Sequence, residues 1–223
     1  MNIDQFSEKF KLIKEEGWTP ALRGGTTGVG YTFETLIGKK EDNQSLPDIE
    51  GYEIKTKLIN NTEWVRLFTH DNKCWNHKKD YIVNTFGKPD KDGKMGIFGN
   101  VRIGTLDGYG LFTVITKDSV ILMHINGSKL GEWNFENLIK KFEIKFPSLI
   151  LVLADRKIED DVIFYKYNTA TVLDGGSKES FRNMFLNGKI YIEPRRNTNK
   201  CYGTSLTTSV KYLPELFTLK REL

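Results

Sequence analysis

The sequence predicts an α/β fold in which helices flank a mixed central β-sheet, and three observations carry this prediction. Apolar residues near the N-terminus recur every three or four positions, a pattern typical of an amphipathic helix. Residues 50–58 alternate between apolar and charged side chains, as a strand does. Residues 148–154, SLILVLA, are apolar almost without a break, which indicates a strand buried on both faces.

Two helices are expected before the first strand. The first stops at Gly17, and the second follows a glycine-rich stretch at 23–30 and closes at Gly38. Their apolar faces are formed by Ile3, Phe6, Phe10 and Ile13 in the first and by Val29, Phe33, Leu36 and Ile37 in the second.

The strand at 50–58 is expected to pair with its neighbour in the chain. An Asn-Asn pair at 60–61 predicts a turn, so residues 62–69 are interpreted as the hairpin partner. Residues 70–95 are polar and lysine-rich, which indicates a loop with a short strand. From 96 to 125, two turns separate three apolar segments, and this pattern predicts a meander.

The C-terminal part is expected to alternate helices and strands. Asn134 predicts the start of a helix that Pro147 ends, just before the buried strand. The remaining elements are a strand at 161–167, a helix from Ser177 to about Asn187, a strand at 189–194 and a short interrupted helix at 209–217.

Composition places the chain among ordinary globular proteins. It has 223 residues, of which 39% are apolar and 28% charged, so we expect one domain with a full core. Two cysteines 127 positions apart do not form a disulfide framework, which favours a reducing cytoplasm. The N-terminus lacks the apolar stretch of a signal peptide, and no apolar run is long enough to cross a bilayer.

Positive charge gathers in two regions. The net charge is +4, residues 178–202 hold six Lys and Arg against two Glu, and residues 72–94 hold six Lys against three Asp. Such stripes suit a polyanion such as DNA, although a solvated basic face would give the same counts.

The candidate catalytic residues lie on and around the strand at 50–58. Glu53 and Lys55 are two positions apart, so their side chains share one face of the strand, and Asp48 precedes it across a turn. Carboxylates are hard oxygen ligands for Mg²⁺, and a nearby ammonium can stabilise charge on a reacting phosphate. Glu34, in the preceding helix, could approach the same site. Alone, the pattern is also that of a solvated charged strand face.

Together these segments resemble a known family. The Gly28-x-Gly30-x-x-x-Glu34 helix, followed by Pro47-Asp48, four residues and Glu53-x-Lys55, resembles the MvaI/BcnI group of type II restriction endonucleases. That group is close to the mismatch-repair nickase MutH and shares the PD-(D/E)XK nuclease fold. The resemblance implies a restriction-endonuclease-like core and Mg²⁺-dependent cutting of double-stranded DNA. It also implies Asp48 and Glu53 as metal ligands, Lys55 as the catalytic lysine and Glu34 as the helix glutamate.

The resemblance extends to organisation and partners. It implies a cytoplasmic monomer that nicks the two strands in turn, beside a cognate DNA methyltransferase that acts on the same site without a stable complex. We expect a single nuclease domain over 1–223, with its core at 22–69 and 96–154 and a DNA-recognition lobe from 70–95 and 176–205. The candidate DNA-binding residues are Arg23, His77, Arg195, Arg196 and Lys200. The group's C-terminal basic element usually contains histidine or arginine; here it has no histidine, so we expect a different set of base-reading residues.

Other readings of the same residues stay open. A MutH-like strand nickase or a catalytically inert DNA-binding module would carry a similar sequence. The glycine-rich stretch lacks the Lys-Ser/Thr of a nucleotide-binding loop but could bind a DNA phosphate. Cys74 and His77 are spaced as zinc ligands, but no second close pair accompanies them.

Overall fold

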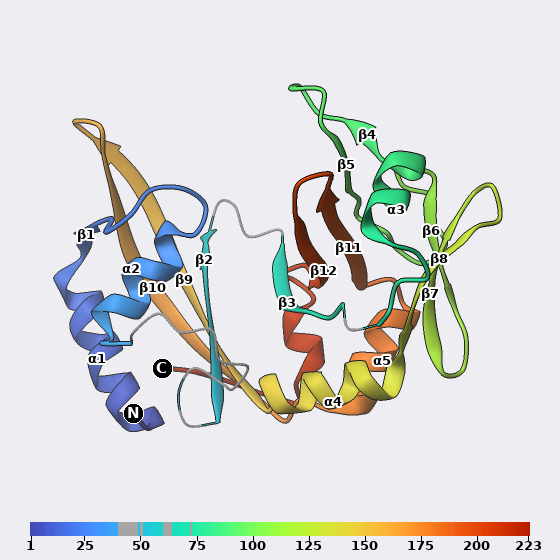
Figure 1. Ribbon diagram of the computed structural model, residues 1–223. Coiled ribbons are helices and arrows are strands. Elements are labelled where there is room, and N and C mark those ends of the chain that lie inside the picture. The colour runs from blue at the N-terminus through green and yellow to red at the C-terminus, as the bar shows by residue number, and fades with distance from the viewer. Residues whose placement is uncertain (40–48, 50, 60–63, 72) are drawn as a thin grey trace. The chain divides into compact units, whose positions relative to one another are not determined.

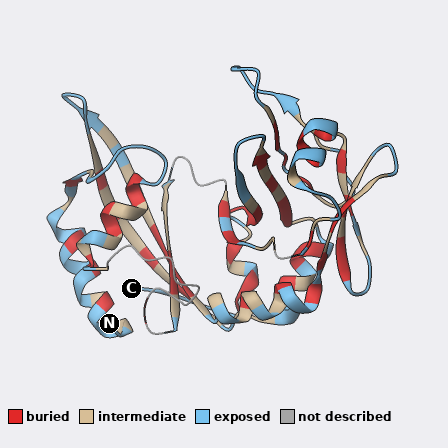
Figure 2. Ribbon diagram, viewed as in Figure 1, coloured by how far each residue is buried: buried red, intermediate tan, exposed pale blue. Residues whose placement is uncertain are grey.

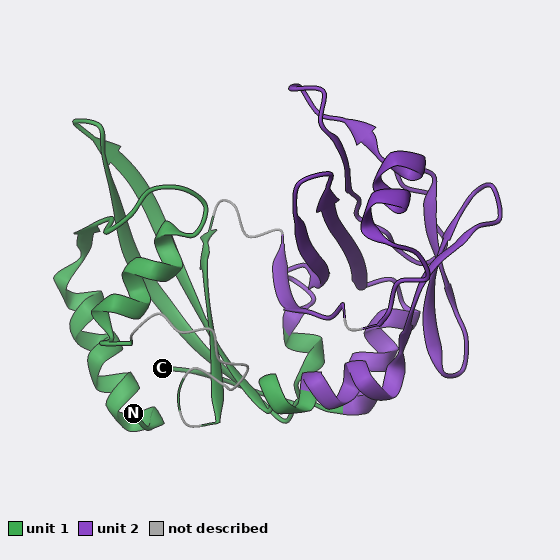
Figure 3. Ribbon diagram, viewed as in Figure 1, with its two compact units in different colours: residues 1–63, 143–177, 214–223 green, residues 64–142, 178–213 purple. Residues whose placement is uncertain are grey.

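The computed structural model describes residues 1–39, 49, 51–59, 64–71 and 73–223. The chain divides into two compact units (Figure 3). Unit 1 comprises residues 1–63, 143–177 and 214–223, and unit 2 comprises residues 64–142 and 178–213. Unit 1 is therefore assembled from three separate stretches of chain.

Unit 1 is built on a five-stranded mixed sheet in the order β1-β10-β9-β2, with β13 also paired to β10 (Figure 1). Its strands are β1 (Trp18–Pro20), β2 (Tyr52–Leu58), β9 (Ser148–Glu159), β10 (Val162–Asp174) and β13 (Leu219–Glu222). β2 runs parallel to β9, and the other pairs are antiparallel. The parallel pair is possible because more than eighty residues separate its strands, since a parallel connection needs a long crossover.

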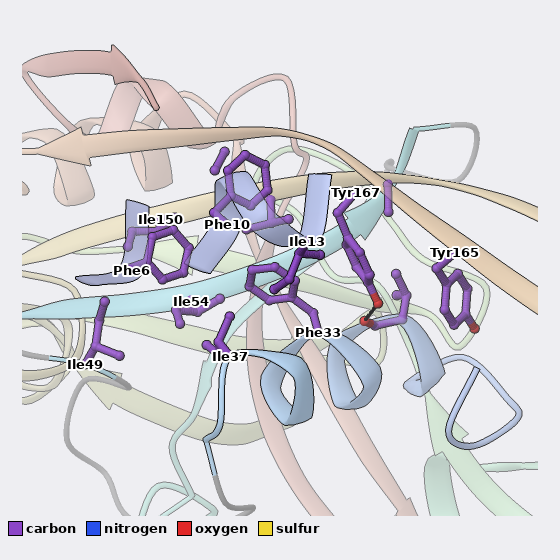
Figure 4. Close-up of a cluster of buried hydrophobic side chains, with 14 of the residues drawn as sticks. Phe6, Phe10, Ile13, Phe33, Ile37, Ile49, Ile54, Ile150, Tyr165 and Tyr167 are labelled. Carbon is purple, nitrogen blue, oxygen red and sulfur yellow. Dashed lines mark hydrogen bonds between the residues drawn. The ribbon is translucent and has the colours of Figure 1, made fainter. Parts of the chain in front are cut away.

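The core of unit 1 lies between this sheet and two helices, α1 (Ile3–Glu16) and α2 (Gly28–Leu36). Figure 4 shows the aromatic centre of this core, in which Phe33 of α2 packs edge-on against Phe6 and Phe10 of α1. The hydroxyl of Tyr167 on β10 donates a hydrogen bond of 3.0 Å to the Val29 carbonyl, which fixes α2 to the sheet. The buried faces of both helices confirm the predicted apolar spacing (Figure 2).

Unit 2 contains two sheets. The larger has the order β3-β12-β11-β5-β4, and the smaller has the order β6-β7-β8. The strands of the larger sheet are β3 (Val65–Thr69), β4 (Lys88–Pro89), β5 (Met95–Phe98), β11 (Ile190–Asn197) and β12 (Cys201–Thr208). The smaller sheet holds β6 (Leu111–Ile115), β7 (Ser119–His124) and β8 (Lys129–Asn134). The helical elements outside unit 1's core are α3 (Lys79–Phe86), α4 (Phe135–Lys145), α5 (Lys178–Leu186) and the 3₁₀ helix η2 (Leu213–Leu216).

Several predicted elements are confirmed. Asn134 accepts a hydrogen bond from the Asn137 backbone N–H at 3.3 Å and so caps α4, and β9 is buried from Leu149 to Val152. The mixed sheet with flanking helices is also confirmed. Within the described part of the chain, no helix has the length and apolar character needed to span a membrane.

Three local predictions are wrong and one is incomplete. The strand at 50–58 is not half of a hairpin with 62–69, because β2 pairs with β9 whereas β3 pairs with β12. Residues 70–95 hold the expected loop and a short strand, β4, but also a helix that was not predicted, α3, whose Ile82, Val83 and Phe86 are buried. The meander at 96–125 is divided, because β5 pairs with β11 and only the later strands share a sheet. Residues 209–217 hold only one 3₁₀ turn. The predicted turn at 60–61 lies outside the described residues.

Candidate active site

Strand β2 positions the two central candidate residues. Glu53 and Lys55 lie on the same face, and the parallel register places them opposite Leu149 and Leu151 of β9. Leu149 is fully buried, so the strand is held against the most apolar part of the sheet. A rigid strand is a precise support for a reactive side chain, because its neighbours fix its direction.

The Glu53 side chain is only 2% exposed, so the alternative interpretation, a solvated charged strand face, does not hold for Glu53. A buried carboxylate is costly unless charges or hydrogen bonds compensate it. Its Oε1 accepts a hydrogen bond from the Lys55 ammonium. Its Oε2 lies 3.1 Å from Nζ of Lys145, in the last turn of α4, but accepts no hydrogen bond among the described residues. Two ammonium groups therefore face one buried carboxylate.

This arrangement fits a divalent cation. Glu53 Oε2 is a buried, hard oxygen that forms an ion pair with Lys145 at 3.1 Å but accepts no hydrogen bond among the described residues, and a hard carboxylate oxygen is the kind of ligand that Mg²⁺ takes from a protein. Asp48, the second expected ligand, lies outside the described residues. The described part of the chain contains no group of three or more His, Cys, Asp or Glu side chains that could form a complete metal site.

Glu34 is half-buried on α2, and its Oε1 lies 4.0 Å from the position that a Cβ on Gly30 would take. The same helix begins at Gly28, where no larger residue fits. A Cβ there would lie 2.4 Å from the Arg23 carbonyl oxygen and 2.8 Å from the Tyr165 hydroxyl. Arg23 itself is exposed, and its guanidinium lies 4.2 Å from the centre of the Tyr31 ring. The glycine-rich stretch thus presents an arginine beside the start of a helix.

The other DNA-binding candidates lie in unit 2. His77 is exposed, and its ring centre lies 4.8 Å from that of Tyr81 on α3. Lys200 is exposed in the turn between β11 and β12, and Arg195 is partly buried. Both cations lie over the ring of Tyr202, at 5.1 Å for Lys200 and 5.9 Å for Arg195. The end of this hairpin therefore carries two cations around one exposed aromatic ring.

Arg196 differs from its neighbour, because it is only 3% exposed. Its Nη2 donates to both carboxylate oxygens of Asp71 at 3.1 Å, and its guanidinium lies 3.5 Å from the centre of the Trp75 ring. Asp71 Oδ1 also accepts hydrogen bonds from Trp75 Nε1 and from the Thr204 hydroxyl, each at 2.6 Å. Burial lowers the pKa of Arg196, and Asp71 opposes that shift. We refer to these four residues as the Asp71 cluster.

Sequence reasoning missed Lys145 and the Asp71 cluster. Lys145 sits three residues before β9, so only knowledge that β9 pairs with β2 could have brought it to Glu53. Asp71 and Arg196 are 125 positions apart, and no local pattern joins them. Cys74 is buried, and burial raises the pKa of its thiol to about 11, which disfavours the thiolate that a zinc site needs.

A mixed sheet in which a strand parallel to its neighbour carries a buried glutamate, with a lysine two residues further on, is typical of a nuclease of the restriction-endonuclease type. The chain belongs to the MvaI/BcnI restriction endonuclease family, whose model matches residues 7–211. It is thus a type II site-specific endonuclease, and it acts on DNA.

Two solved structures are similar over almost their whole length. The restriction endonuclease MvaI in complex with its cognate DNA substrate has a TM-score of 0.79 at 22% identity and covers 100% of this chain and 99% of its own. MvaI in the absence of DNA has a TM-score of 0.54 at 23% identity, with coverage of 100% and 98%. These likenesses establish the fold. A search of the curated proteins gives no match.

Proposed function

We propose that the chain hydrolyses phosphodiester bonds within a specific sequence of double-stranded DNA and that it requires Mg²⁺. The single observation that carries this proposal is the buried Glu53 carboxylate, which lies beside Lys55 with one oxygen free of hydrogen bonds. Burying a carboxylate is costly, so a charge at such a position contributes little to stability. A buried carboxylate next to an ammonium group is instead compatible with a catalytic role.

In this proposal Asp48 and Glu53 hold the cation. The bound ion would polarise a phosphoryl oxygen and lower the pKa of a water molecule. Lys55 carries its charge next to Glu53 on the same strand face, where it can orient the attacking water and stabilise the negative charge that grows on phosphorus. Glu34 assists from α2 by holding a water molecule at the same site. Asp48 and Glu34 enter this scheme from the family resemblance.

Each unit carries basic residues that would contact DNA. Arg23 would contact a phosphate beside the N-terminus of α2, since backbone N–H groups there attract anions. His77, Arg195 and Lys200 would contact the groove or backbone from unit 2. We propose a different role for Arg196: its guanidinium is already held by Asp71, so it positions the hairpin that carries Arg195 and Lys200 and does not read a base.

The direct test is incubation of the purified chain with unmethylated phage DNA and Mg²⁺. Discrete fragments would support a site-specific nuclease, and no cutting under any divalent cation would contradict the proposal. Glu53→Gln, Asp48→Asn and Lys55→Met should each abolish cutting, whereas Lys140→Met should not. Lys140 is a suitable control because it is an exposed lysine that pairs with Glu136 on the outside of α4.

Calcium offers a separate readout, because it should support binding without turnover. Lys55→Met should retain calcium-dependent affinity for the target while losing cleavage, since the ammonium acts in the transition state. Equal losses of affinity and rate would reassign Lys55 to phosphate binding.

We further propose that one chain acts alone and cuts the two strands in succession. One active site hydrolyses one phosphodiester at a time, and a monomer lacks the two-fold axis with which a dimer matches a palindrome. On supercoiled plasmid, nicked circles should accumulate before linear product, and sedimentation should show one protein per duplex. Two chains per site and linear product without a nicked intermediate would contradict this. Nicking of one strand only would favour a MutH-like role.

A further inference from the structure

We propose that Lys145 occupies the metal-facing oxygen of Glu53 when no divalent cation is bound and withdraws when one binds. Lys145 is then a positioning residue of the metal site and an electrostatic competitor of the metal. This inference rests on the proposed function, in which Glu53 is a metal ligand.

The first supporting observation is that the two carboxylate oxygens of Glu53 contact different lysines. Oε1 accepts a hydrogen bond from Lys55, and Oε2 lies 3.1 Å from Nζ of Lys145. The Lys55 ammonium thus pairs with Oε1, which leaves Oε2 as the oxygen that a cation would bind. The oxygen without a hydrogen bond, which is the better ligand, is the one that Lys145 covers.

The second support is the burial of the three groups. Glu53 is 2% exposed, and the side chains of Lys55 and Lys145 are 22% and 19% exposed. If Glu53 had no cationic partner, its buried charge would be uncompensated, and the folded chain would be strongly destabilised. The second ammonium, on Lys145, therefore compensates the buried charge of Glu53 and holds its side chain in place before the cation arrives.

The third support is that the ammonium and the cation cannot share the oxygen. Mg²⁺ binds a carboxylate at about 2.0–2.1 Å, and an ammonium 3.1 Å from the same oxygen would lie in direct repulsion with it. Lys145 can leave because its four-carbon side chain is flexible and starts from the last turn of a helix.

The proposal predicts opposite effects on two quantities: the stability of the metal-free chain and its affinity for a divalent cation. Removal of the Lys145 charge should make the metal-free chain less stable, because Glu53 loses a partner. It should also make cation binding tighter, because the cation no longer has to displace an ammonium. A lysine with only a structural role would give the first effect and would leave cation affinity unchanged or weaker.

The experiment compares Lys145→Met with the wild-type chain and with Lys140→Met, the exposed lysine on the same helix. Thermal unfolding is measured first in chelator and then across a Mn²⁺ titration without DNA, so that the readout is independent of cleavage. Lys145→Met should unfold at a lower temperature in chelator and reach half-saturation at about fivefold lower Mn²⁺ or less, the low end of couplings between linked sites. Lys140→Met should match the wild type in both.

Two further variants keep the result interpretable. Lys145→Gln, which can still donate a hydrogen bond to Glu53, serves if the methionine variant does not fold, and it should also bind Mn²⁺ more tightly. Lys145→Arg retains the charge and should keep the wild-type affinity. Unchanged or weaker Mn²⁺ binding by the neutral variants would overturn the proposal for Lys145.

Glu53→Gln separates this failure from a failure of the proposed function. If Glu53→Gln loses Mn²⁺ binding while the neutral Lys145 variants bind as the wild type does, only the role of Lys145 is refuted. If Glu53→Gln binds Mn²⁺ normally, Glu53 is not a ligand and both proposals fall.

Discussion

Replacement of Asp71 by alanine should destabilise the chain strongly, because it leaves a buried arginine without its carboxylate partner. Asp71 is itself 30% exposed, but it carries the negative charge opposite Arg196, whose side chain is 4% exposed. The substitution removes both hydrogen bonds of the Arg196 Nη2 and the acceptor for the Thr204 hydroxyl. Arg196 Nε has no hydrogen-bond partner among the described residues, so the buried guanidinium would lose the acceptors that Asp71 provides.

The magnitude follows from the cost of an unpaired buried charge. Removing one partner of a buried ion pair costs about 3–5 kcal/mol, and the partial exposure of Asp71 places the expected value near the lower end, about 3 kcal/mol. For a chain of this length, each kcal/mol shifts the unfolding temperature by about 2–4 °C, which gives a decrease of roughly 6–12 °C. The cation–π contact of Arg196 with Trp75 remains and offsets little of this loss.

Urea unfolding followed by tryptophan fluorescence measures this change, because Trp75 lies within the cluster. Asp71→Asn is the matched control: it keeps an acceptor for Trp75 and Thr204 but loses the charge. The double variant Asp71→Ala with Arg196→Met should be more stable than Asp71→Ala alone, since no buried charge is then left unpaired. A loss below about 1 kcal/mol for Asp71→Ala would show that water solvates Arg196, and would refute the reasoning.

Three further outcomes test the fold. Gly28→Ala should lower the unfolding temperature, because its Cβ would lie 2.4 Å from the Arg23 carbonyl oxygen; an unchanged value would contradict the close approach. Phe33→Ala should cost about 3–5 kcal/mol in urea unfolding, since the ring is fully buried. Burial, and then Lys141, lower the pKa of His70, so the unfolded chain binds a proton that the folded chain does not. Stability should therefore fall as the pH drops below about 6.5, and His70→Gln should reduce that dependence if the assignment is correct.

The local part of the structure could be predicted from the sequence. Periods of two and of three to four residues report which side chains share a face, and they correctly placed Glu53 beside Lys55 and Phe33 on the buried side of α2. These are properties of short segments, for which backbone geometry alone sets the direction of each side chain.

Contacts between segments far apart in the chain could not be predicted from the sequence. The turn predicted at 60–61 placed the partner of β2 in the adjacent segment, but the partner is β9, which follows β2 only after residues 64–142 of unit 2. Without this pairing, the sequence could not show that Lys145 lies beside Glu53 or that Glu53 is buried. Arg196 was assigned to DNA because its sequence neighbours are basic, whereas its burial depends on Asp71, which is 125 residues away.

The discontinuity of unit 1 has a consequence for the nascent chain on the ribosome. Glu53 and Lys55 are synthesised early, but the strand that supports them, β9, and the second ammonium, Lys145, follow about ninety residues later. β10, which pairs with β9, in turn pairs with β13 at Leu219–Glu222. Domains fold as units once their parts have emerged, and both stretches of unit 2, residues 64–142 and 178–213, precede β13. Unit 2 can therefore fold before the sheet of unit 1 gains its β13 strand.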